Sequence, residues 1–84
     1  MDRPLLLNKL EEILREILEV DHLQITETTV ADDVQDWDSI NHVRLLVAIE
    51  EEFGFQFSTE DVGGIKNVGR LLDLVQAKLA AGAP

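Results

Sequence analysis

The chain has 84 residues, a formal net charge of −10 from 17 acidic and 7 basic side chains, and no cysteine. Its length predicts a single domain with a core near the lower limit for independent folding. The charge argues against nucleic acid and anionic membranes as partners and favours basic protein surfaces, and the lack of cysteine excludes disulfides and a thiol nucleophile. No apolar run is long enough to cross a membrane or to form a signal peptide, so we expect a cytoplasmic protein. Its small size and net charge make a monomer the default expectation.

Apolar residues recur at spacings of three and four from Pro4 to Val20, which predicts an amphipathic helix. The stripe that it should bury consists of Leu6, Leu10, Ile13, Leu14, Ile17 and Leu18. On its outer face, Glu11 and Arg15 are four residues apart, in the orientation that favours an ion pair.

Residues 21–38 have neither a helical nor a strand period, and their threonine and aspartate clusters are typical of turns. A loop of this length in so small a domain normally has a function. Four apolar residues are spaced so that they can anchor it over the helices, namely Leu23, Ile25, Val30 and Val34.

The loop ends in Asp36-Trp37-Asp38-Ser39-Ile40, where the most apolar segment of the chain begins. Asp38 or Ser39 can cap a new helix, because a short oxygen side chain accepts the first backbone N–H groups. The carboxylates of Asp36 and Asp38 would lie at the positive end of that helix's dipole. The sequence therefore predicts an exposed serine hydroxyl at a helix start, surrounded by acids, with Trp37 as a packing anchor beside it.

We expect this second helix to cover Ser39–Phe53 and, because it is apolar around most of its circumference, to be the central one. Its inner stripe is predicted to comprise Ile40, Val43, Leu46, Val47 and Phe53, widened by Leu45, Ala48 and Ile49. The Glu50-Glu51-Glu52 run lies in its last turns, where the dipole disfavours negative charge. That mismatch indicates that the acids serve a partner, and a merely solvated face is the alternative.

Gly54 is typical of a helix end, and Phe55-Gln56-Phe57 alternates like a short extended segment with both rings turned inward. Ser58 should cap a short third helix, with acids in its first turn. Gly63 and Gly64 weaken that helix, because glycine is a poor helix former.

Asn67 should cap the last helix, and residues 80–84 are expected to fray. The buried stripe of this helix is predicted to be Val68, Leu71, Leu72, Val75 and Leu79. The chain is thus predicted to be all-α, with three main helices, one short helix and a long first loop. It should form a single domain over residues 1–84, with a core of about residues 4–79.

Ser39 and His42 are three residues apart and would share a helix face close to Asp36 or Asp38, a set that could act as nucleophile, base and acid of a hydrolase. Such an enzyme also needs an oxyanion hole and a walled pocket, and helices of this size leave little room for either. No spacing typical of zinc or calcium ligands occurs. We therefore expect neither an enzyme nor a metal site, with His42 as an ordinary exposed helix residue and His22 as a loop residue.

The sequence resembles the acyl carrier protein family in Asp38-Ser39-Ile40, in Val43 and Val47 of the helix that follows, in the Glu50-Glu51-Glu52 run and in Phe53-Gly54. The resemblance covers nearly the whole chain. The three-residue motif alone would be weak, but together with the helix and its glutamate run it is specific.

This resemblance implies a four-helix acyl-carrier-like bundle in which Ser39, next to Asp38, carries a phosphopantetheine arm. A separate phosphopantetheinyl transferase attaches the arm from coenzyme A, and the arm's thiol then holds an acyl or aminoacyl group as a thioester. The implied function is that of a discrete carrier, not an enzyme, in fatty-acid, lipid or secondary-metabolite synthesis.

By the same resemblance, acyl ligases or synthases bring basic residues to an acidic face with small apolar residues at its centre. On this chain the face comprises Asp38, Ile40, Val43, Val47, Glu50, Glu51, Glu60 and Asp61. Similar proteins shelter the acyl chain in a cleft, and the matching residues are Val43, Leu46, Val47, Phe53, Ile65, Val68 and Leu72. Ordinary core packing is the alternative role for the cleft residues.

The chain departs from the family pattern at several positions. Ile40 replaces leucine after the serine, Asn41 and Arg44 replace acids, and Gly63-Gly64 replaces charged residues. The face is thus less acidic near the serine, which favours a specialised carrier. A peptidyl or aminoacyl carrier is one alternative, and an unmodified acidic helical module that docks on a basic partner is another.

Overall fold

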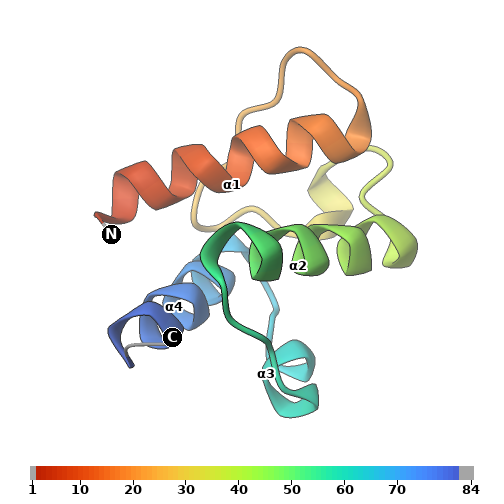
Figure 1. The fold of residues 1–84 in the computed structure, drawn as a ribbon. Helices are drawn as coiled ribbons and strands as arrows, with labels where there is room; N and C mark the ends of the chain where they lie inside the picture. The colour runs from red at the N-terminus through yellow and green to blue at the C-terminus, as the bar shows by residue number, and fades with distance from the viewer. Residues whose placement is uncertain (1, 82–84) are drawn as a thin grey trace.

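A computed structural model describes residues 2–81 of the chain. This part contains α1 (Arg3–Leu18), the 3₁₀ turn η1 (Ala31–Asp33), α2 (Ser39–Phe53), α3 (Thr59–Gly63) and α4 (Val68–Ala80), and no β-strand. The predicted all-α fold, with three main helices, one short helix and a long first loop, is confirmed (Figure 1).

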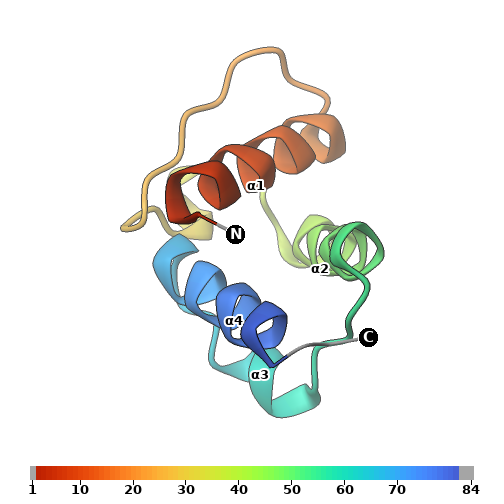
Figure 2. The same cartoon turned by 60° about the vertical axis from the view of Figure 1, so that its left-hand side comes forward.

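The three main helices surround one apolar core. α1 and α2 lie side by side and run in opposite directions, α4 closes the remaining side, and α3 lies outside, next to α4 (Figures 1 and 2). The buried residues are Leu6, Leu10, Ile13, Leu14, Ile25, Trp37, Leu45, Leu46, Ile49, Phe55, Val68, Leu71, Leu72 and Val75. α3 contributes none of them, so it is the least anchored helix.

α1 was predicted over Pro4–Val20 but ends at Leu18. It ends early because Glu19 adopts a left-handed conformation with φ of 56°. The N–H of Val20 then donates to the carbonyl oxygen of Arg15 over 3.1 Å, the hydrogen-bond pattern of a Schellman end. Glycine normally occupies the left-handed position, and nothing in the sequence marks a glutamate for it.

The other main helices begin where their caps predicted. α2 has the predicted bounds, with Asp38 as its cap and Gly54, at φ of 76°, directly after its last turn. Asn67 caps α4 as predicted, but α4 continues through Ala80, which had been expected to fray. Residues 82–84 of that predicted tail lie outside the described residues. Within residues 2–81, no helix combines the length and apolar character that crossing a membrane requires.

The buried face of α2 is not the one that the sequence predicted. Ile40, Val43 and Val47 were assigned to the inner stripe but are 67, 58 and 45% exposed. Leu45 and Ile49, predicted only to widen the stripe, are completely buried. A helix with apolar residues around most of its circumference has two possible inner faces, and only packing against the rest of the bundle selects one.

The first loop is tied to α1 by Glu11 and Arg15. These two side chains form the predicted i,i+4 ion pair at 2.7 Å, but their other hydrogen bonds go to the loop. Arg15 donates to the carbonyl oxygen of Leu23 over 2.8 Å, and the Glu11 carboxylate accepts from the N–H of Ile25 over 2.9 Å. The pair therefore fixes the loop as well as the helix, and Ile25 is buried as predicted.

Backbone groups of the same loop cap the start of α4. The N–H groups of Val68 and Gly69 donate to the carbonyl oxygens of Thr29 and Glu27 over 2.9 and 2.7 Å. The first N–H groups of a helix have no partner within it, so the loop satisfies two of them. Arg3 reinforces the contact, because its guanidinium reaches both the Glu27 carboxylate at 2.8 Å and the Gly69 carbonyl oxygen at 3.0 Å.

The last part of the loop leads directly to α2. Leu23 and Val34 pack against the core as predicted, whereas Val30 is half-buried outside it. η1, which the sequence did not predict, begins after Val30, whose N–H donates to the carboxylate of Asp33 over 3.1 Å.

The segment after α2 also agrees with its prediction, since Phe55 is buried and its ring centroid lies 5.1 Å from that of Phe57.

α3 is held by a reciprocal cap and one ion pair. Ser58 Oγ accepts from the N–H of Asp61 over 3.1 Å, and the Asp61 carboxylate accepts from the N–H of Ser58 over 2.8 Å. This is a capping box. The helix stops at Gly63, in agreement with the predicted weakness of the glycine pair. Its tie to α4 is the ion pair between Asp61 and Lys78 at 2.9 Å.

We expect this tie to weaken in acid. Hydrogen bonding from Lys78, and then from the backbone N–H of Ser58, lowers the pKa of Asp61 from 3.8 to about 2. A carboxyl group whose pKa falls on folding stabilises the fold above its unfolded pKa and loses that contribution as the pH falls through its folded pKa. The stability difference between the native chain and Asp61→Asn should therefore be full at neutral pH and shrink from pH 3.8 to about 2.

Urea denaturation at a series of pH values measures this difference. Glu60→Gln is the matched control, because Glu60 is exposed on the same helix and should show little difference at any pH. A difference for Asp61→Asn that persists unchanged at pH 2 would contradict the assigned role of the ion pair.

Candidate functional site

The start of α2 is held by its own cap. Asp38 Oδ1 accepts from the N–H of Asn41 over 2.9 Å, and the Asn41 side-chain amide donates to the carbonyl oxygen of Asp36 over 2.8 Å. Asp36 is left-handed, with φ of 68°, and its carbonyl oxygen also accepts from the N–H of Asp38 over 2.9 Å. The sequence predicted a cap at Asp38 or Ser39. The structure assigns it to Asp38, which leaves the hydroxyl of Ser39 outside the cap.

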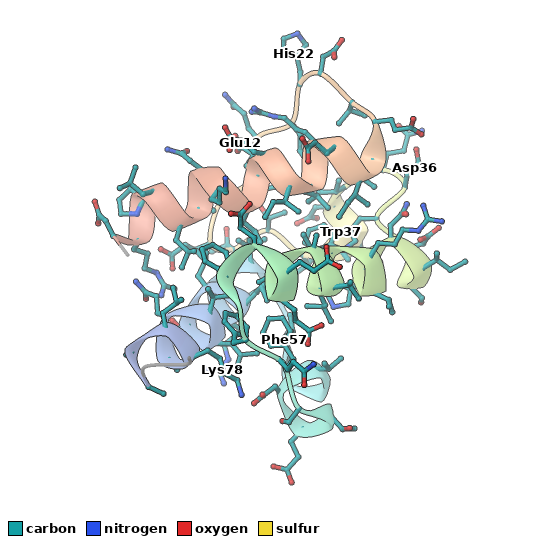
Figure 3. The ribbon with its side chains drawn as sticks, in the orientation of Figure 1. Glu12, His22, Asp36, Trp37, Phe57 and Lys78 are labelled. Carbon is teal, nitrogen blue, oxygen red and sulfur yellow. The ribbon has the colours of Figure 1, made fainter. Side chains whose placement is uncertain are left out.

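Trp37 and His42 add a second contact to the first turn of α2. The indole Nε1–H of Trp37 donates to His42 Nδ1 over 3.1 Å, and the ring centroids are 5.9 Å apart. Contacts between the residue before the cap and the fourth helical residue fix the direction in which the chain enters a helix. Trp37 is buried, as expected of a packing anchor. Figure 3 shows it between α1 and α2, with Asp36 at the margin.

His42 was predicted to be an ordinary exposed residue, and that prediction is wrong. Its ring is half-buried, and burial lowers its pKa. An indole N–H can only donate, so Nδ1 is the acceptor and the neutral ring carries its proton on Nε2. The spacing of Trp37 and His42 around the cap was the available signal, because it is that of a hydrophobic staple. His22 lies in the first loop, as expected, and is exposed at its outer tip (Figure 3).

Ser39 is the first residue of α2 and is exposed. Its hydroxyl forms no hydrogen bond with any residue in the described range 2–81. Ser58 is the only other serine in the chain and also lies at a helix start among acids. Its Oγ, however, accepts from the N–H of Asp61. Of the two serines, therefore, only Ser39 presents a hydroxyl that no hydrogen bond within residues 2–81 occupies.

A hollow of about 330 Å³ lies beside this hydroxyl. Its walls are formed by Ser39, Asp38, Trp37, His42, Ala31 and Ile65, with Asp32 as a second acid. A smaller cavity of about 40 Å³ shares Ala31, Trp37, His42 and Ile65 and extends to Lys66, Asn67 and Leu71. The fold thus brings η1, the start of α2 and the segment between α3 and α4 together around the serine.

Comparison with known proteins identifies the family. The family model of the phosphopantetheine attachment site matches residues 8–75. The chain is 34% identical over 82 residues to the acyl carrier protein of Thermosynechococcus vestitus, covering 96% of this chain and 100% of the relative. It is 32% identical over 80 residues to that of Coprothermobacter proteolyticus, covering 94% and 96%. The chain belongs to the acyl carrier protein family.

A solved structure agrees with this assignment. The solution structure of the holo acyl carrier protein from Geobacter metallireducens matches with a TM-score of 0.84 and 37% identity, covering 90% of this chain and 87% of that one. The chain is therefore a discrete carrier protein, and its cofactor is phosphopantetheine. An unmodified interaction module, one of the alternatives that the sequence left open, is therefore not supported.

The residues at the start of α2 fit phosphopantetheine. A phosphodiester requires a hydroxyl that is accessible and not engaged elsewhere, and Ser39 has one. The cap and the Trp37–His42 contact give that hydroxyl a fixed position. Ser39 would hold the group covalently, and the walls of the hollow, Trp37, His42 and Ile65, would contact it.

The hydrolase alternative lacks its central contact in this acyl carrier protein. A nucleophilic serine needs a hydrogen bond to its base, but the Nδ1 of His42 is bonded to Trp37 and no bond joins His42 to Ser39. Ser39 and His42 do lie one turn apart at the start of α2, as their spacing predicted. The hydrogen-bond partner of the His42 ring, however, is Trp37 and not Ser39.

An exposed apolar strip runs along α2 from the modification motif. It consists of Ile40, Val43 and Val47, which the sequence also assigned to the partner face. Arg44 is exposed on the same side of the helix and forms no ion pair within residues 2–81, and Glu51 is exposed one turn beyond Val47. The spacing of these residues, three and four apart, places them on one face.

The acids predicted to meet partners divide into two groups. Glu50 accepts from the N–H of Phe57 over 2.8 Å, and Asp61 is bonded within its own helix and to α4. Both are therefore part of the fold. Glu51 and Glu60 are exposed and have no hydrogen bond or ion pair with the described residues. These two are the acids that remain available to a partner.

The predicted acyl cleft is closed in this arrangement. Leu46, Val68 and Leu72 lie in the packed core, while Phe53 and Ile65 are half-buried at its edge. Only Ile65 of these five also lines the hollow beside the serine. A cleft along the predicted residues would require core side chains to separate, and it stays a prediction.

Proposed function

We propose that Ser39 is the attachment residue of this acyl carrier protein. The observation that supports this most directly is its hydroxyl, which is exposed, unbonded and fixed at the first residue of α2. A phosphopantetheinyl transferase would join this oxygen to the phosphopantetheine of coenzyme A as a phosphodiester and release the adenosine bisphosphate portion. Once attached, the arm supplies the thiol that the chain lacks, and this thiol holds the acyl group as a thioester.

The residues around Ser39 present the arm and carry out no chemical step of their own in this proposal. We place the protein in the cytoplasm as a specialised carrier in fatty-acid, lipid or secondary-metabolite synthesis, loaded by an acyl ligase or synthase. Asn41 and Arg44 stand where fatty-acid carriers have acids. This difference supports enzyme partners that are specific to this carrier. The same site suits an aminoacyl cargo.

Charge and apolar surface together support α2 as the partner face. The net charge of −10 attracts basic surfaces, and exposed charges of this kind speed association more than they tighten it. The strip of Ile40, Val43 and Val47 offers the apolar centre. Arg44 lies within it, so a partner that covers the strip must place a carboxylate or carbonyl opposite the guanidinium, because a buried charge without a partner is costly.

Intact-mass spectrometry tests the attachment. The chain is incubated with coenzyme A and a broad-specificity phosphopantetheinyl transferase, with a known carrier protein in the same reaction as a positive control. We expect a mass increase of one phosphopantetheine, located on the peptide that contains Ser39. Complete modification of the control with none of this chain, in a folded sample and with several transferases, would contradict the proposal.

The partner face is tested with a matched pair of charge reversals. With a transferase whose docking surface is basic, Glu51→Lys should lower kcat/KM for modification and Arg44→Glu should raise it, each by roughly fivefold, a coupling of about 1 kcal/mol. Both positions are exposed, so neither change should alter thermal stability by more than about 0.5 kcal/mol. Added salt should shrink both effects. Equal modification rates for the two variants would show that the transferase docks on a face other than that of α2.

A further inference from the structure

The structure contains a second feature at the serine that the attachment itself does not use. This is the hollow lined by Trp37 and His42, together with the smaller cavity behind it. We propose that the hollow holds the neutral first portion of the arm, and that His42 positions it by donating a hydrogen bond from Nε2. This inference rests on Ser39 being the attachment residue.

The position of the hollow favours the arm over any other occupant. Ser39 is itself part of the wall, so a group bonded to its Oγ begins at the rim and needs no separate binding step. The smaller cavity shares Trp37, His42 and Ile65 with the hollow. The two therefore adjoin, and an arm that begins at Ser39 meets residues that line both.

The proton on His42 gives the hollow a hydrogen-bond donor. Nδ1 is occupied by the indole N–H of Trp37 at 3.1 Å, which leaves the single proton of the neutral ring on Nε2. The ring forms no other hydrogen bond with the residues between 2 and 81. Phosphopantetheine carries two methyl groups, a hydroxyl and an amide directly after its phosphate, and the amide carbonyl is an acceptor for such a donor.

Charge decides which portion of the arm enters. Asp32 and Asp38 both line the hollow, and like charges repel the phosphodiester, so it stays at the surface. Lys66 lines only the smaller cavity and is itself exposed, so it does not offset the two acids. The neutral portion meets no such repulsion.

The smaller cavity has room for a methyl group. Its volume of about 40 Å³ is above the roughly 15 Å³ that one water requires, so the character of the wall decides between the two occupants. Ala31, Ile65, Leu71 and the indole of Trp37 make much of the wall apolar. Apolar cavities favour apolar occupants. The methyl groups next to the phosphate are the apolar part of the arm nearest to Ser39.

The competing interpretation is that Trp37 and His42 only stabilise the helix start. Two substitutions separate the interpretations. His42→Phe keeps an aromatic ring against the indole but removes both the donor and the acceptor of the indole N–H, whereas His42→Gln keeps a donor and an acceptor but removes the ring. A purely structural role predicts that the arm contacts of each variant follow its stability. Positioning of the arm predicts that they follow the donor, so that they fall in His42→Phe and return in His42→Gln.

The experiment is NMR on the isotope-labelled chain before and after modification. Mass spectrometry first establishes that the native chain and both variants carry the arm on Ser39, because a failure at that stage concerns the attachment proposal and not this one. Trp37 is the only tryptophan, so a single indole N–H signal reports on the hollow. We expect modification to shift this signal and to produce nuclear Overhauser contacts from the arm's methyl groups to Trp37 and Ile65.

His42→Phe should then reduce the ratio of bound to free arm by about fivefold, the change in equilibrium constant that corresponds to one neutral hydrogen bond, and the arm contacts should weaken with it. His42→Gln should restore a large part of them, even if it is the less stable variant. A modified native chain with no arm contact to Trp37 or Ile65 would overturn the proposal that the hollow holds the arm. Contacts as strong in His42→Phe as in the native chain would overturn the role of His42.

Discussion

Alanine at Ser39 will leave the chain folded but unable to accept the arm, whereas alanine at Ser58 will leave it able to accept the arm but less stable. The chain has only these two serines. Both begin a helix close to aspartates, and so a motif search based on acids and a helix start finds both. They differ in what the hydroxyl does, and this difference predicts opposite outcomes.

Ser58 Oγ is part of the fold, because it accepts from the N–H of Asp61 over 3.1 Å. Removal of a capping serine costs about 1 kcal/mol, so Ser58→Ala should lower the stability by that amount and leave modification unchanged. Ser39 lies inside the first turn, and Asp38 supplies the cap. Ser39→Ala should therefore change stability by no more than about 0.5 kcal/mol, as for other exposed positions, and abolish modification completely.

Denaturation curves and intact-mass spectra on the same three samples measure both properties. The opposite outcomes of the two variants matter more than either variant alone, because a misfolded Ser39→Ala chain would also fail to be modified. Modification of Ser39→Ala at the native rate would place the arm on another residue. Loss of modification in Ser58→Ala, with the fold intact, would show that α3 takes part in recognition by the transferase.

The sequence predicted helix starts well because caps are local. Asp38, Ser58 and Asn67 each accept from the N–H three residues ahead, so a pattern within a few residues contains the whole interaction. The same locality allowed Ser39 to be singled out. The sequence also predicted Ser58 as a cap, but it left open whether Asp38 or Ser39 caps α2, and the structure assigns that cap to Asp38.

What the sequence could not predict depends on contacts between distant segments. The buried face of α2 was assigned to Val43 and Val47, because nothing local distinguishes them from Leu45 and Ile49. Glu50 looked available to partners, yet it is bonded to the backbone of Phe57 beyond the helix end. In both cases the deciding contact lies outside the window in which hydrophobic period or charge is counted.

Alanine at Gly69 will destabilise the protein, although alanine normally favours a helix. A Cβ at this position would lie 2.9 Å from the backbone carbonyl oxygen of Glu27, closer than such atoms approach. The same carbonyl accepts from the N–H of Gly69 over 2.7 Å, so the loop cannot withdraw without losing that bond. Over-packing against a rigid neighbour costs about 1–3 kcal/mol, and the adjacent bond from Val68 to Thr29 should weaken with it.

Gly63→Ala is the matched control, because a Cβ there meets nothing within 4 Å. It should stabilise α3, by up to about 1 kcal/mol. Thermal denaturation of the two variants should therefore give shifts of opposite sign, several degrees downward for Gly69→Ala, at about 4–8 °C per kcal/mol for a domain of this size. A neutral or stabilising Gly69→Ala would mean that the loop does not rest on α4 as closely as its hydrogen bonds indicate.

The variant at Gly69 also tests how the loop supports the serine. Glu27 and Thr29 are held on α4, and the chain then passes through η1 to the cap of α2. If this contact fixes the path of the loop, then Gly69→Ala should speed hydrogen exchange at the N–H of Asn41, which Asp38 protects, more than the global loss of stability requires. Exchange that rises only in proportion to that loss would show that the cap and the Trp37–His42 contact hold the start of α2 on their own.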